Sequence, residues 1–468
     1  MSKKPPTSAA DMVMENLISL CKRRGFVFQG SEIYGGLAGT WDYGPLGVAL
    51  RNNIKRMWWK RFVDDRDDMY SVDAAILMNQ NVWKASGHVG GFADPLVEDT
   101  KTKKRYRADH LLEQAGVDPR GMNAAAMDAA IKERKVKSPD GNPVSDVRQF
   151  NMMFKTHVGA LQDDSSISYL RPETAQGMFV NFKNILDTFH PNLPFGLAQI
   201  GKAFRNEIAP RDFVFRVREF EQMEIEYFVD PRDAKKVTET FEALYEEQLA
   251  FLKSLGLTSS KIHKIEVPES DRAHYSKRSV DTEFDFPFGQ KELLGIAYRT
   301  DFDLKAHSEA SKVDLSYFDE DTKERFIPHC IEPTFGVDRL TLAVLSDAYT
   351  EDELGGEKRI YLKLSPVVAP VKVAVFPLLK NKSVLVEKAR EIYTMLKKEF
   401  GAVVFDDNGN IGKRYRRQDE IGTPFCVTVD FDTIEKGAGV TVRNRDTGEQ
   451  ERVALNDLTN HLKHVLLV

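Results

Sequence analysis

The chain has 468 residues, 42% of them hydrophobic and 29% charged, and its formal net charge is −5. This balance is typical of a soluble globular protein with two to four domains, and RNA binding at this net charge requires local basic patches. The N-terminus lacks the apolar segment of a secretory signal, and no apolar run approaches the roughly 20 residues of a membrane span. Three scattered cysteines argue against disulfides and for a reducing, cytoplasmic setting, and no pair has the spacing of a structural zinc site.

The first predicted elements are a tail and two helices. Residues 1–10 are polar and terminal, so we expect a disordered tail, and residues 11–24 are predicted to form a helix. A second helix is predicted near 46–62, because its apolar residues recur with helical spacing: Leu46, Leu50, Ile54, Met57, Trp58 and Phe62. The opposite face is basic, which suits RNA but is more often simply solvated: Arg51, Lys55, Arg56, Lys60 and Arg61.

A glycine-rich loop, a basic run and a small insertion follow these helices. The loop at 86–95 contains His88, and a histidine in such a loop is most often structural. The basic run at 101–107 is typical of a solvated surface. Residues 101–150 are predicted to form a small helical insertion that ends in a loop with proline and glycine.

Two strands joined by a charged turn are predicted at 204–229, and one of their faces is strongly polar. Alternation places residues of equal parity on one side of a strand. From 213 onward, one face therefore carries Arg216, Arg218, Phe220, Gln222, Glu224, Glu226 and Phe228. Arginine forks bind phosphate oxygens, an aromatic ring stacks on a flat base, and Glu207 can accept a hydrogen bond from an exocyclic amine. The pattern favours a nucleotide site, and a salt-bridged surface hairpin is the alternative.

The segments on either side of this hairpin place charged residues at the ends of elements. Arg171-Pro172-Glu173 is predicted to end a strand and to start a helix, with Pro172 in the first turn. A strong helix is predicted within 231–260. Near 338, Asp338 and Arg339 open an apolar helix. An arginine is poorly placed at a helix N-terminus unless an anion lies between the two.

The part after a proline-bearing linker at 361–370 alternates strands and helices, which predicts a compact α/β domain. A basic run with an aromatic residue follows a glycine turn in this domain: Lys413, Arg414, Tyr415, Arg416 and Arg417. Such a run suits stacking and phosphate contacts with single-stranded RNA, and an exposed helix start is the alternative.

Three strings occur in the order and spacing of the class II aminoacyl-tRNA synthetases: RPETAQG at 171–177, RNE at 205–207 with REFEQMEIEYF at 218–228, and EPTFGVDR at 332–339. Together they resemble the dimeric glycyl-tRNA synthetases, from about Glu15 to the end of the chain. The resemblance implies an α+β fold, with a catalytic domain of antiparallel sheet flanked by helices at 11–365. It also implies a C-terminal α/β anticodon-binding domain at 366–468, and a homodimer that uses the helix near 46–62 and the strand after it.

The resemblance further implies an enzyme that attaches glycine to tRNA(Gly) through a glycyl-adenylate, with ATP and Mg²⁺. In that interpretation Arg205 holds the α-phosphate, Arg216 and Arg339 hold the γ-phosphate, Glu207 reads the adenine amine and Phe220 stacks on the ring. Glu292 is expected to hold Mg²⁺ with ATP. The full set expected at ATP is Arg205, Asn206, Glu207, Phe215, Arg216, Val217, Arg218, Glu219, Phe220, Glu292, Leu293, Gly336, Val337, Asp338 and Arg339.

Glycine is expected beside ATP, with its ammonium among Glu173, Glu224 and Glu332. The full set that resemblance assigns to glycine is Arg107, Glu173, Phe220, Glu221, Gln222, Met223, Glu224, Glu332, Pro333, Thr334, Phe335 and Gly336. The anticodon of tRNA is expected at the basic run 413–417. The insertion could contact the acceptor stem, which the sequence does not decide.

Two other functions stay open at this stage. A class II synthetase for threonine, proline or serine would keep the fold, although the EFEQME and EPTFG strings count against it. A non-catalytic accessory or RNA-binding subunit would be expected to lose the phosphate-binding arginines, and Arg205, Arg216 and Arg339 are all present. The size of a pocket is not visible in a sequence, so the choice of glycine over alanine or serine rests on the resemblance.

Overall fold

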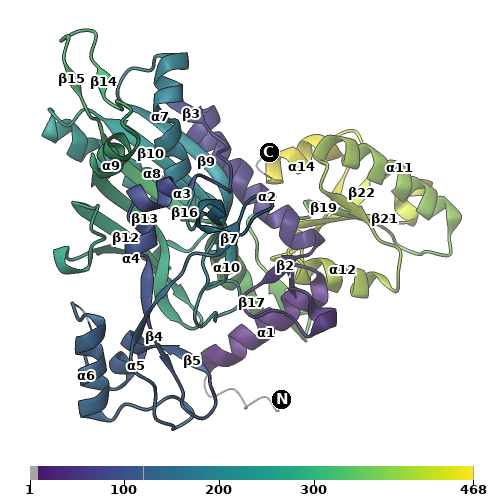
Figure 1. Cartoon of the computed structure of the whole chain (residues 1–468). Helices are drawn as coiled ribbons and strands as arrows, with labels where there is room; N and C mark the ends of the chain where they lie inside the picture. The colour runs from purple at the N-terminus through teal and green to yellow at the C-terminus, as the bar shows by residue number, and fades with distance from the viewer. Residues whose placement is uncertain (1–8, 120, 467–468) are drawn as a thin grey trace.

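The computed structural model describes residues 9–119 and 121–466, and it arranges them around two separate β-sheets (Figure 1). Residues 1–8 of the predicted tail lie outside the described residues, and the first helix, α1 (Ala9–Arg24), already includes residue 9. A short hairpin of β1 (Val27–Gln29) and β2 (Trp41–Tyr43) leads to α2 (Pro45–Trp59), which continues as a turn of π-helix through Asp64. The two predicted N-terminal helices are thus confirmed.

The larger sheet has seven strands in the order β11-β12-β13-β16-β10-β9-β3. Every neighbouring pair is antiparallel except β3 with β9, so the predicted antiparallel sheet is confirmed. The strands are β3 (Met69–Ser71), β9 (Phe195–Phe204), β10 (Glu219–Val229), β11 (Ile262–Glu266), β12 (Arg278–Phe286), β13 (Gly289–Thr300) and β16 (His329–Gly336).

Helices cover both faces of this sheet, and strand alternation decides what each face meets. On one side α2, α8 (Ala234–Ser254) and α10 (Val337–Ala348) form the main core with odd-numbered residues of β10, such as Met223 and Ile225. On the other side α7 (Ala175–Phe189) and α9 (Phe302–Ser311) pack on Phe228, at the end of the even-numbered row. On this second face of the sheet, β10 also carries the polar row Phe220, Gln222, Glu224 and Glu226.

The segment before α7 differs from the sequence prediction. Pro172 was expected in the first helical turn, yet α7 begins at Ala175 and Thr174 is its N-cap. The reason is a competing partner: the N–H and the hydroxyl of Thr174 both donate to one carboxylate oxygen of Glu224 on β10. Residues 171–174 therefore run along the sheet as an irregular segment, which brings Glu173 close to the polar row.

The insertion is a small mixed module rather than a purely helical one. A three-stranded sheet of β5 (Arg105–Arg107), β4 (Ala93–Glu98) and β6 (Arg148–Asn151) packs on α5 (Ala108–Gln114) and α6 (Ala124–Arg134). It has its own apolar core, built by residues that include Val97, Leu112 and Ile131. The sequence prediction of a helical insertion at 101–150 therefore missed the sheet. In Figure 1 this module lies below the main sheet, and β4 extends from the module toward that sheet.

Short elements complete the N-terminal part. They are α3 (Gln80–Ala85), α4 (His88–Gly91), β7 (Lys155–His157), β8 (Ile167–Tyr169), β14 (Tyr317–Phe318) and β15 (Arg325–Phe326). In the described part of the chain, no helix is both long enough and apolar enough to cross a membrane.

The second sheet belongs to the predicted C-terminal α/β domain, which the structure confirms. Its order is β20-β19-β21-β22-β23; the first three strands are parallel and the last two are antiparallel additions. The strands are β19 (Val373–Pro377), β20 (Val403–Phe405), β21 (Phe425–Val429), β22 (Val440–Asn444) and β23 (Gln450–Val453). The helices are α11 (Ser383–Phe400), α12 (Ile411–Glu420), α13 (Phe431–Glu435) and α14 (Leu458–Leu466).

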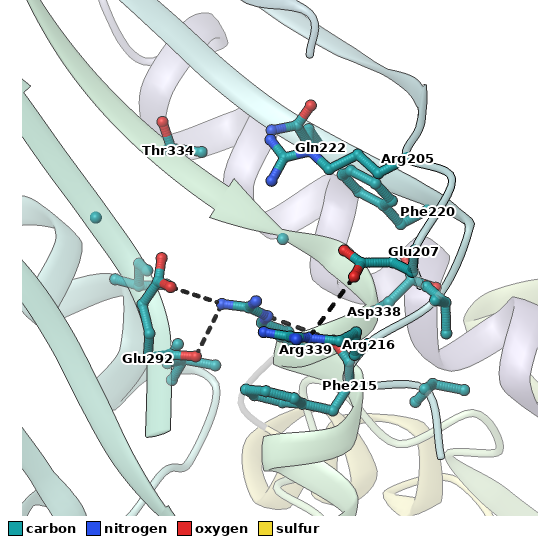
Figure 2. Close-up of a pocket in the computed structure, with 16 residues that line it drawn as sticks. Arg205, Glu207, Phe215, Arg216, Phe220, Gln222, Glu292, Thr334, Asp338 and Arg339 are labelled. Carbon is teal, nitrogen blue, oxygen red and sulfur yellow. Dashed lines mark hydrogen bonds and ion pairs between the residues drawn. The ribbon is translucent and has the colours of Figure 1, made fainter. Parts of the chain in front are cut away.

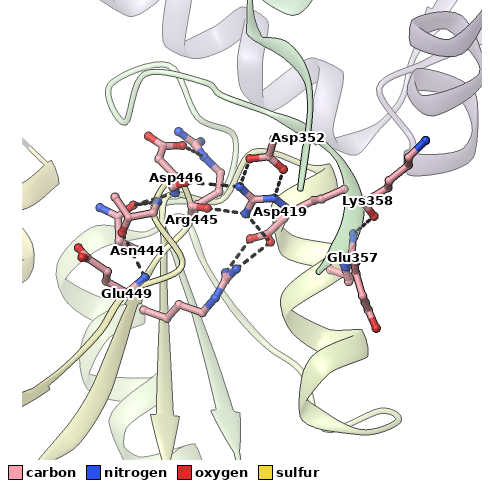
Figure 3. A network of polar contacts seen from close by, with 12 residues as sticks. Asp352, Glu357, Lys358, Asp419, Asn444, Arg445, Asp446 and Glu449 are labelled. Atoms are coloured by element: carbon pink, nitrogen blue, oxygen red, sulfur yellow. Dashed lines mark hydrogen bonds and ion pairs between the residues drawn. The ribbon is translucent and has the colours of Figure 1, made fainter. Parts of the chain in front are cut away.

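A hairpin that extends from α10 ties the two parts together. It consists of β17 (Tyr349–Leu354) and β18 (Glu357–Leu362), and Arg359 on β18 is 1% exposed. The Arg359 guanidinium pairs with Asp352 of the hairpin at 2.6 Å and with Asp419 of α12 at 3.1 Å. Asp419 also pairs with Arg443 of β22 at 2.8 Å (Figure 3). The hairpin is therefore anchored to the C-terminal domain by a buried ion network.

Candidate functional site

A pocket opens on the large sheet where β10, β13 and β16 lie side by side, beneath the loop at 205–217. Its walls are Arg205, Glu207, Val214, Phe215, Arg216, Val217, Phe220, Gln222, Glu292, Leu293, Leu294, Gly295, Thr334, Gly336, Asp338 and Arg339. Figure 2 shows three arginine side chains pointing into it from different segments. The sequence analysis had assigned most of these positions to a nucleotide.

Arg205 follows the last residue of β9 and keeps the end of its guanidinium available. Its Nε donates to the Pro172 carbonyl at 3.0 Å, and its guanidinium carbon lies 5.3 Å from the ring centre of Phe92 and 5.3 Å from that of Phe220. Within the described part of the chain, no carboxylate pairs with Arg205. A guanidinium held between two rings and without a counter-ion is prepared to bind an anion.

The other two arginines lie next to each other in the pocket, and Nε of Arg339 donates to the carbonyl of Phe215, the residue before Arg216, at 3.5 Å (Figure 2). Arg216 has Glu207 as its nearest acid, at 3.9 Å from Nε to Oε2. Arg339, in the first turn of α10, pairs with the Glu292 carboxylate at 3.1 Å and lies 4.4 Å from the ring centre of Phe215. Arg339 holds the pKa of Glu292 below its usual range, so this carboxylate is ionised. The position of Arg339 at a helix N-terminus is thus partly explained by its ion pair with the Glu292 carboxylate.

An acidic cluster beside Glu292 was missed by the sequence analysis. Glu283 on β12 lies opposite Glu292 on β13, and Asp281 is two residues away on the same strand. Burial raises the pKa of Asp281 to about 7, and Glu292 and Glu283 add to the rise. The alternation in VDTEFDF places Asp281 and Glu283 on one face, so the same pattern that revealed β10 could have revealed this cluster.

Behind Gln222 lies a cluster of three buried carboxylates, those of Glu173, Glu224 and Glu332, which we call the chamber. Glu224 accepts hydrogen bonds from Thr174 and, at 2.7 Å, from the Gln222 side chain. Glu173 lies 3.3 Å from Nε2 of His88. Glu332 on β16 accepts two hydrogen bonds from Arg299, at 2.9 and 3.0 Å. The three acids that resemblance assigned to an ammonium are therefore brought together from three separate elements.

The chamber sets different ionisation states for these acids. Burial alone would raise the pKa of Glu173, but His88 and Arg299 outweigh it and hold the pKa well below its usual range. Burial raises the pKa of Glu332 to about 8, with Arg299 opposing the shift and Glu224 and Glu173 adding to it. Burial and Glu173 likewise raise the pKa of Glu224. Burial and the neighbouring acids thus favour the protonated forms of Glu332 and Glu224, whereas Glu173 is held ionised.

Several residues assigned to ATP by resemblance do not offer their side chains to the pocket. Arg218 donates to the carbonyls of Ala38 and Glu207, so it holds the loop and not a ligand. Glu219 faces away and pairs with Lys202. Asn206 and Val337 are not among the residues that line the pocket, and Val337 is part of the main core.

The same holds for part of the set assigned to glycine. Glu221 pairs with Arg51 and Lys55 of α2 at 3.0 Å each, on the opposite face of β10, and Met223 is in the main core there. Arg107 is held by ion pairs with Asp94 and Asp109. Pro333 and Phe335 are buried on β16. Strand alternation explains these positions, because odd-numbered residues of β10 face the core.

The basic run in the C-terminal domain is only partly a surface. Arg414 is 1% exposed and donates to backbone carbonyls of Pro377, Asp407 and Gly409. The ring of Tyr415 packs on Phe376 at 5.6 Å. The Arg414 side chain is thus directed into the domain and not toward solvent, and the RNA contact expected of Arg414 and Tyr415 stays a prediction.

The remaining residues of the run lie further out. Arg416 pairs with Glu357 of the β17–β18 hairpin at 2.8 Å (Figure 3), and Arg417 pairs with Asp406 at 2.6 Å. Lys413 is exposed, and its side chain has no ion pair in the part of the chain that the structure describes. Within this run Lys413 is exposed and Arg416 and Arg417 are partly exposed, so these three side chains remain the candidates for the expected RNA contact.

Comparison with known proteins adds independent information. Residues 154–348 match the family described as tRNA synthetase class II core domain (G, H, P, S and T), and residues 372–464 match the one described as anticodon binding domain. The chain is 50% identical to a glycine–tRNA ligase of Bacillus cereus, over 96% of this chain and 98% of that protein. A glycine–tRNA ligase of Caldanaerobacter subterraneus is also 50% identical over 97% and 99% of the two chains. One of Geobacillus thermodenitrificans is 51% identical over 95% and 96%.

Proposed function

This chain belongs to the glycine–tRNA ligase family of class II aminoacyl-tRNA synthetases, and on this basis we propose which part of the site binds ATP and which part binds glycine. The protein attaches glycine to tRNA. The observation that supports our division is the arrangement of three arginines in the outer pocket and three carboxylates in the chamber behind it. The outer pocket suits a polyphosphate, and the chamber suits an ammonium.

ATP occupies the outer pocket in this proposal. Arg205 binds the α-phosphate, because its fork has no counter-ion and points past Phe220. Phe220 stacks on the adenine and Glu207 accepts from its amine. Arg216 and Arg339 hold the γ-phosphate from the other side. Glu292 fits Mg²⁺, since its carboxylate lies beside Asp281 in the phosphate pocket and Mg²⁺ takes oxygen ligands. Bound there with ATP, the ion would neutralise phosphate charge.

Glycine lies in the chamber, with its ammonium among Glu173, Glu224 and Glu332 and its carboxylate toward Arg205. A carboxylate oxygen then attacks the α-phosphorus, a new O–P bond forms, and pyrophosphate leaves with the electrons of the broken bond. The nucleophile is already ionised, so the first step needs no general base and depends on positioning and charge neutralisation. A ribose hydroxyl of tRNA afterwards takes the glycyl group, and AMP leaves.

The remaining parts of the chain have proposed roles as well. The large sheet and its insertion (11–365) form the catalytic domain, and residues 366–468 form the domain that meets the anticodon. A homodimer would use α2 and β3, and sedimentation at micromolar concentration should give twice the chain mass; a monomer there would refute it. Three free, buried cysteines among the described residues support a reducing cytoplasm as the location.

The decisive experiment for this function is amino-acid-dependent exchange between ATP and pyrophosphate. Purified protein is assayed with glycine, alanine, serine, threonine and proline, without tRNA. We expect exchange with glycine alone. Exchange with another of these amino acids would keep the mechanism but refute the glycine chamber. No exchange at all would favour an accessory RNA-binding subunit, the other candidate.

The KM for glycine is expected to fall as pH rises from 6.5 to 8.5. Glu332 has a pKa raised to about 8, and the pKa of Glu224 is also raised, so both bind protons more readily in the empty chamber than in water. The ammonium of glycine prefers both ionised and must displace those protons at low pH. One displaced proton changes KM by up to about tenfold per pH unit. The KM for ATP serves as control, and a KM for glycine that is flat or rises with pH would contradict the prediction.

Lys413→Ala is expected to weaken tRNA charging while leaving exchange unchanged. One exposed phosphate contact contributes modestly, so we expect the KM for tRNA to rise about 3-fold to 10-fold at low salt, and we expect the difference from wild type to shrink at high salt, where each phosphate contact contributes less. The measurement compares charging and exchange on the same preparation. Lys436→Ala, an exposed lysine of the same domain, is the matched control. Equal loss in both assays would count against an RNA contact at Lys413.

A further inference from the structure

A continuous chain of buried hydrogen bonds joins two of the three ammonium-binding carboxylates. Arg299 at the end of β13 is 1% exposed and holds both oxygens of Glu332 through its Nη1. The same guanidinium holds both oxygens of Asp303, with Nε and Nη2 at 2.8 Å each. Gln176 on α7 donates from Nε2 to Asp303 at 2.9 Å and to Glu173 at 3.0 Å. The path therefore runs from Glu332 to Glu173 without a break.

The direction of the Gln176 amide is fixed by a histidine. Nε2 of Gln176 donates to two carboxylates, so its Oε1 must face the other way, and it lies 2.7 Å from Nε2 of His307. Burial lowers the pKa of His307, which favours the neutral ring. A neutral ring that carries its proton on Nε2 donates to the amide oxygen. His307 thereby prevents the amide from flipping and presenting oxygen to Glu173.

Two aromatic rings hold the guanidinium plane in place. The guanidinium carbon of Arg299 lies 3.8 Å from the ring centre of Tyr275, in the loop before β12, and 5.3 Å from that of Phe179 on α7. Cation–π contacts of this kind are stronger when both groups are buried. Lysine would keep the charge at this position but would lose the fork that spans Glu332 and Asp303.

Positioning matters here because of the shape of the ligand. An ammonium has three donors arranged around one nitrogen, so its carboxylate partners must converge on one point. Glu173, Glu224 and Glu332 come from three elements that are far apart in the sequence, and a glutamate side chain has several rotamers. Glu224 is held by Thr174 and Gln222. Glu173 and Glu332 are held instead by residues of β13, α7 and α9, which pack together with β16 (Figure 1).

We propose that Arg299, Asp303 and Gln176 are positioning residues that set the spacing of Glu173 and Glu332, and so determine the affinity of the chamber for the ammonium of glycine. None of the three reaches the reacting atoms; they act through the two glutamates. The inference rests on the proposed function, in which these glutamates bind glycine. It predicts that substitutions that break this hydrogen-bond chain weaken glycine binding without weakening ATP binding.

The test is a KM comparison by glycine-dependent exchange between ATP and pyrophosphate. Arg299→Lys is expected to raise the KM for glycine about 10-fold to 100-fold and to leave the KM for ATP within 2-fold, the loss being that of one bidentate charged contact. Gln176→Leu removes the middle of the chain without changing any charge, and we expect a rise of about 10-fold in the KM for glycine alone. Arg278→Lys is the matched control, because Arg278 pairs with Glu242 of α8 and with Glu266 of the neighbouring strand β11, outside the chamber.

The outcomes separate cleanly. A KM for glycine that stays within 2-fold of wild type in folded Gln176→Leu protein overturns the proposal. So does a KM for ATP that rises in step with the KM for glycine, because a general structural defect would move both. If Arg299→Lys does not fold, Gln176→Leu decides alone. If wild-type protein shows no glycine-dependent exchange, the proposed function itself is refuted. This control is measured before the variants.

Discussion

Arg205→Ala is expected to slow glycine-dependent exchange by about 100-fold to 1,000-fold, the usual effect of losing one preorganised donor at a developing charge. Arg205 is the one arginine of the three that line the pocket for which no carboxylate partner is found among the described residues. Its contact with an anion is therefore made only when the anion arrives. Negative charge accumulates on the α-phosphoryl oxygens as the carboxylate attacks, so the loss should appear in kcat more than in the KM for glycine.

The fork matters as well as the charge. Arg205→Lys keeps a cation but loses bidentate geometry and the stacking between Phe92 and Phe220, so we expect an intermediate loss of about tenfold. Lys202→Ala is the control, because Lys202 lies on β9, three residues before Arg205, and pairs with Glu219 in an exposed position. Exchange by Arg205→Ala within twofold of wild type would remove Arg205 from the phosphate site.

Much of the site was predictable because a strand has a period of two. The row Phe220, Gln222, Glu224 and Glu226 was assigned to one face from alternation alone, and the structure confirms that these residues share it. The same rule places Glu221 and Met223 on the core side, where they are found. The family resemblance alone would have assigned them to the ligand, since a motif does not state which residues contribute only backbone.

Other features depend on contacts between distant elements and have no local signal. Arg299 and Asp303 are four residues apart, yet they lie on a strand and on the following helix, and no single periodicity joins them to Glu332. Arg414 looked like a surface cation because its neighbours are basic. In the fold it turns inward to satisfy three backbone carbonyls, one at the end of β19 and two in the loop between β20 and α12. Strands of three to six residues in the insertion carry too little pattern to be seen in a mainly helical composition.

The buried ion network at the hairpin gives the two domains a fixed relation. Arg339, at the start of α10, lines the pocket proposed for ATP, and the β17–β18 hairpin begins directly after α10. Arg359 of this hairpin and Arg443 of the C-terminal sheet share one carboxylate, that of Asp419 (Figure 3). The helix that carries Arg339 therefore continues directly into the hairpin that anchors the C-terminal domain.

Asp419→Ala is expected to destabilise the C-terminal domain and its junction by about 3–5 kcal/mol, because removing one partner of a buried ion pair leaves the others uncompensated. Asp419 and Arg359 are each 1% exposed, and Arg443 is nearly as buried, so water cannot replace the lost carboxylate. A change of this size lowers the Tm of a domain this long by on the order of 10 °C or more.

The measurement is thermal unfolding of the full chain, followed by circular dichroism and by intrinsic fluorescence. Asp432→Ala is the matched control, since Asp432 pairs with Lys436 on the surface of the same domain and exposed pairs contribute about 0–1 kcal/mol. Below its transition the Asp419→Ala protein should keep glycine-dependent exchange, because the pocket is built by the other sheet, whereas tRNA charging should fall as the anticodon-binding domain loosens. An unchanged Tm for Asp419→Ala, or exchange lost in parallel with charging at low temperature, would show that the network does not act as an anchor between the domains.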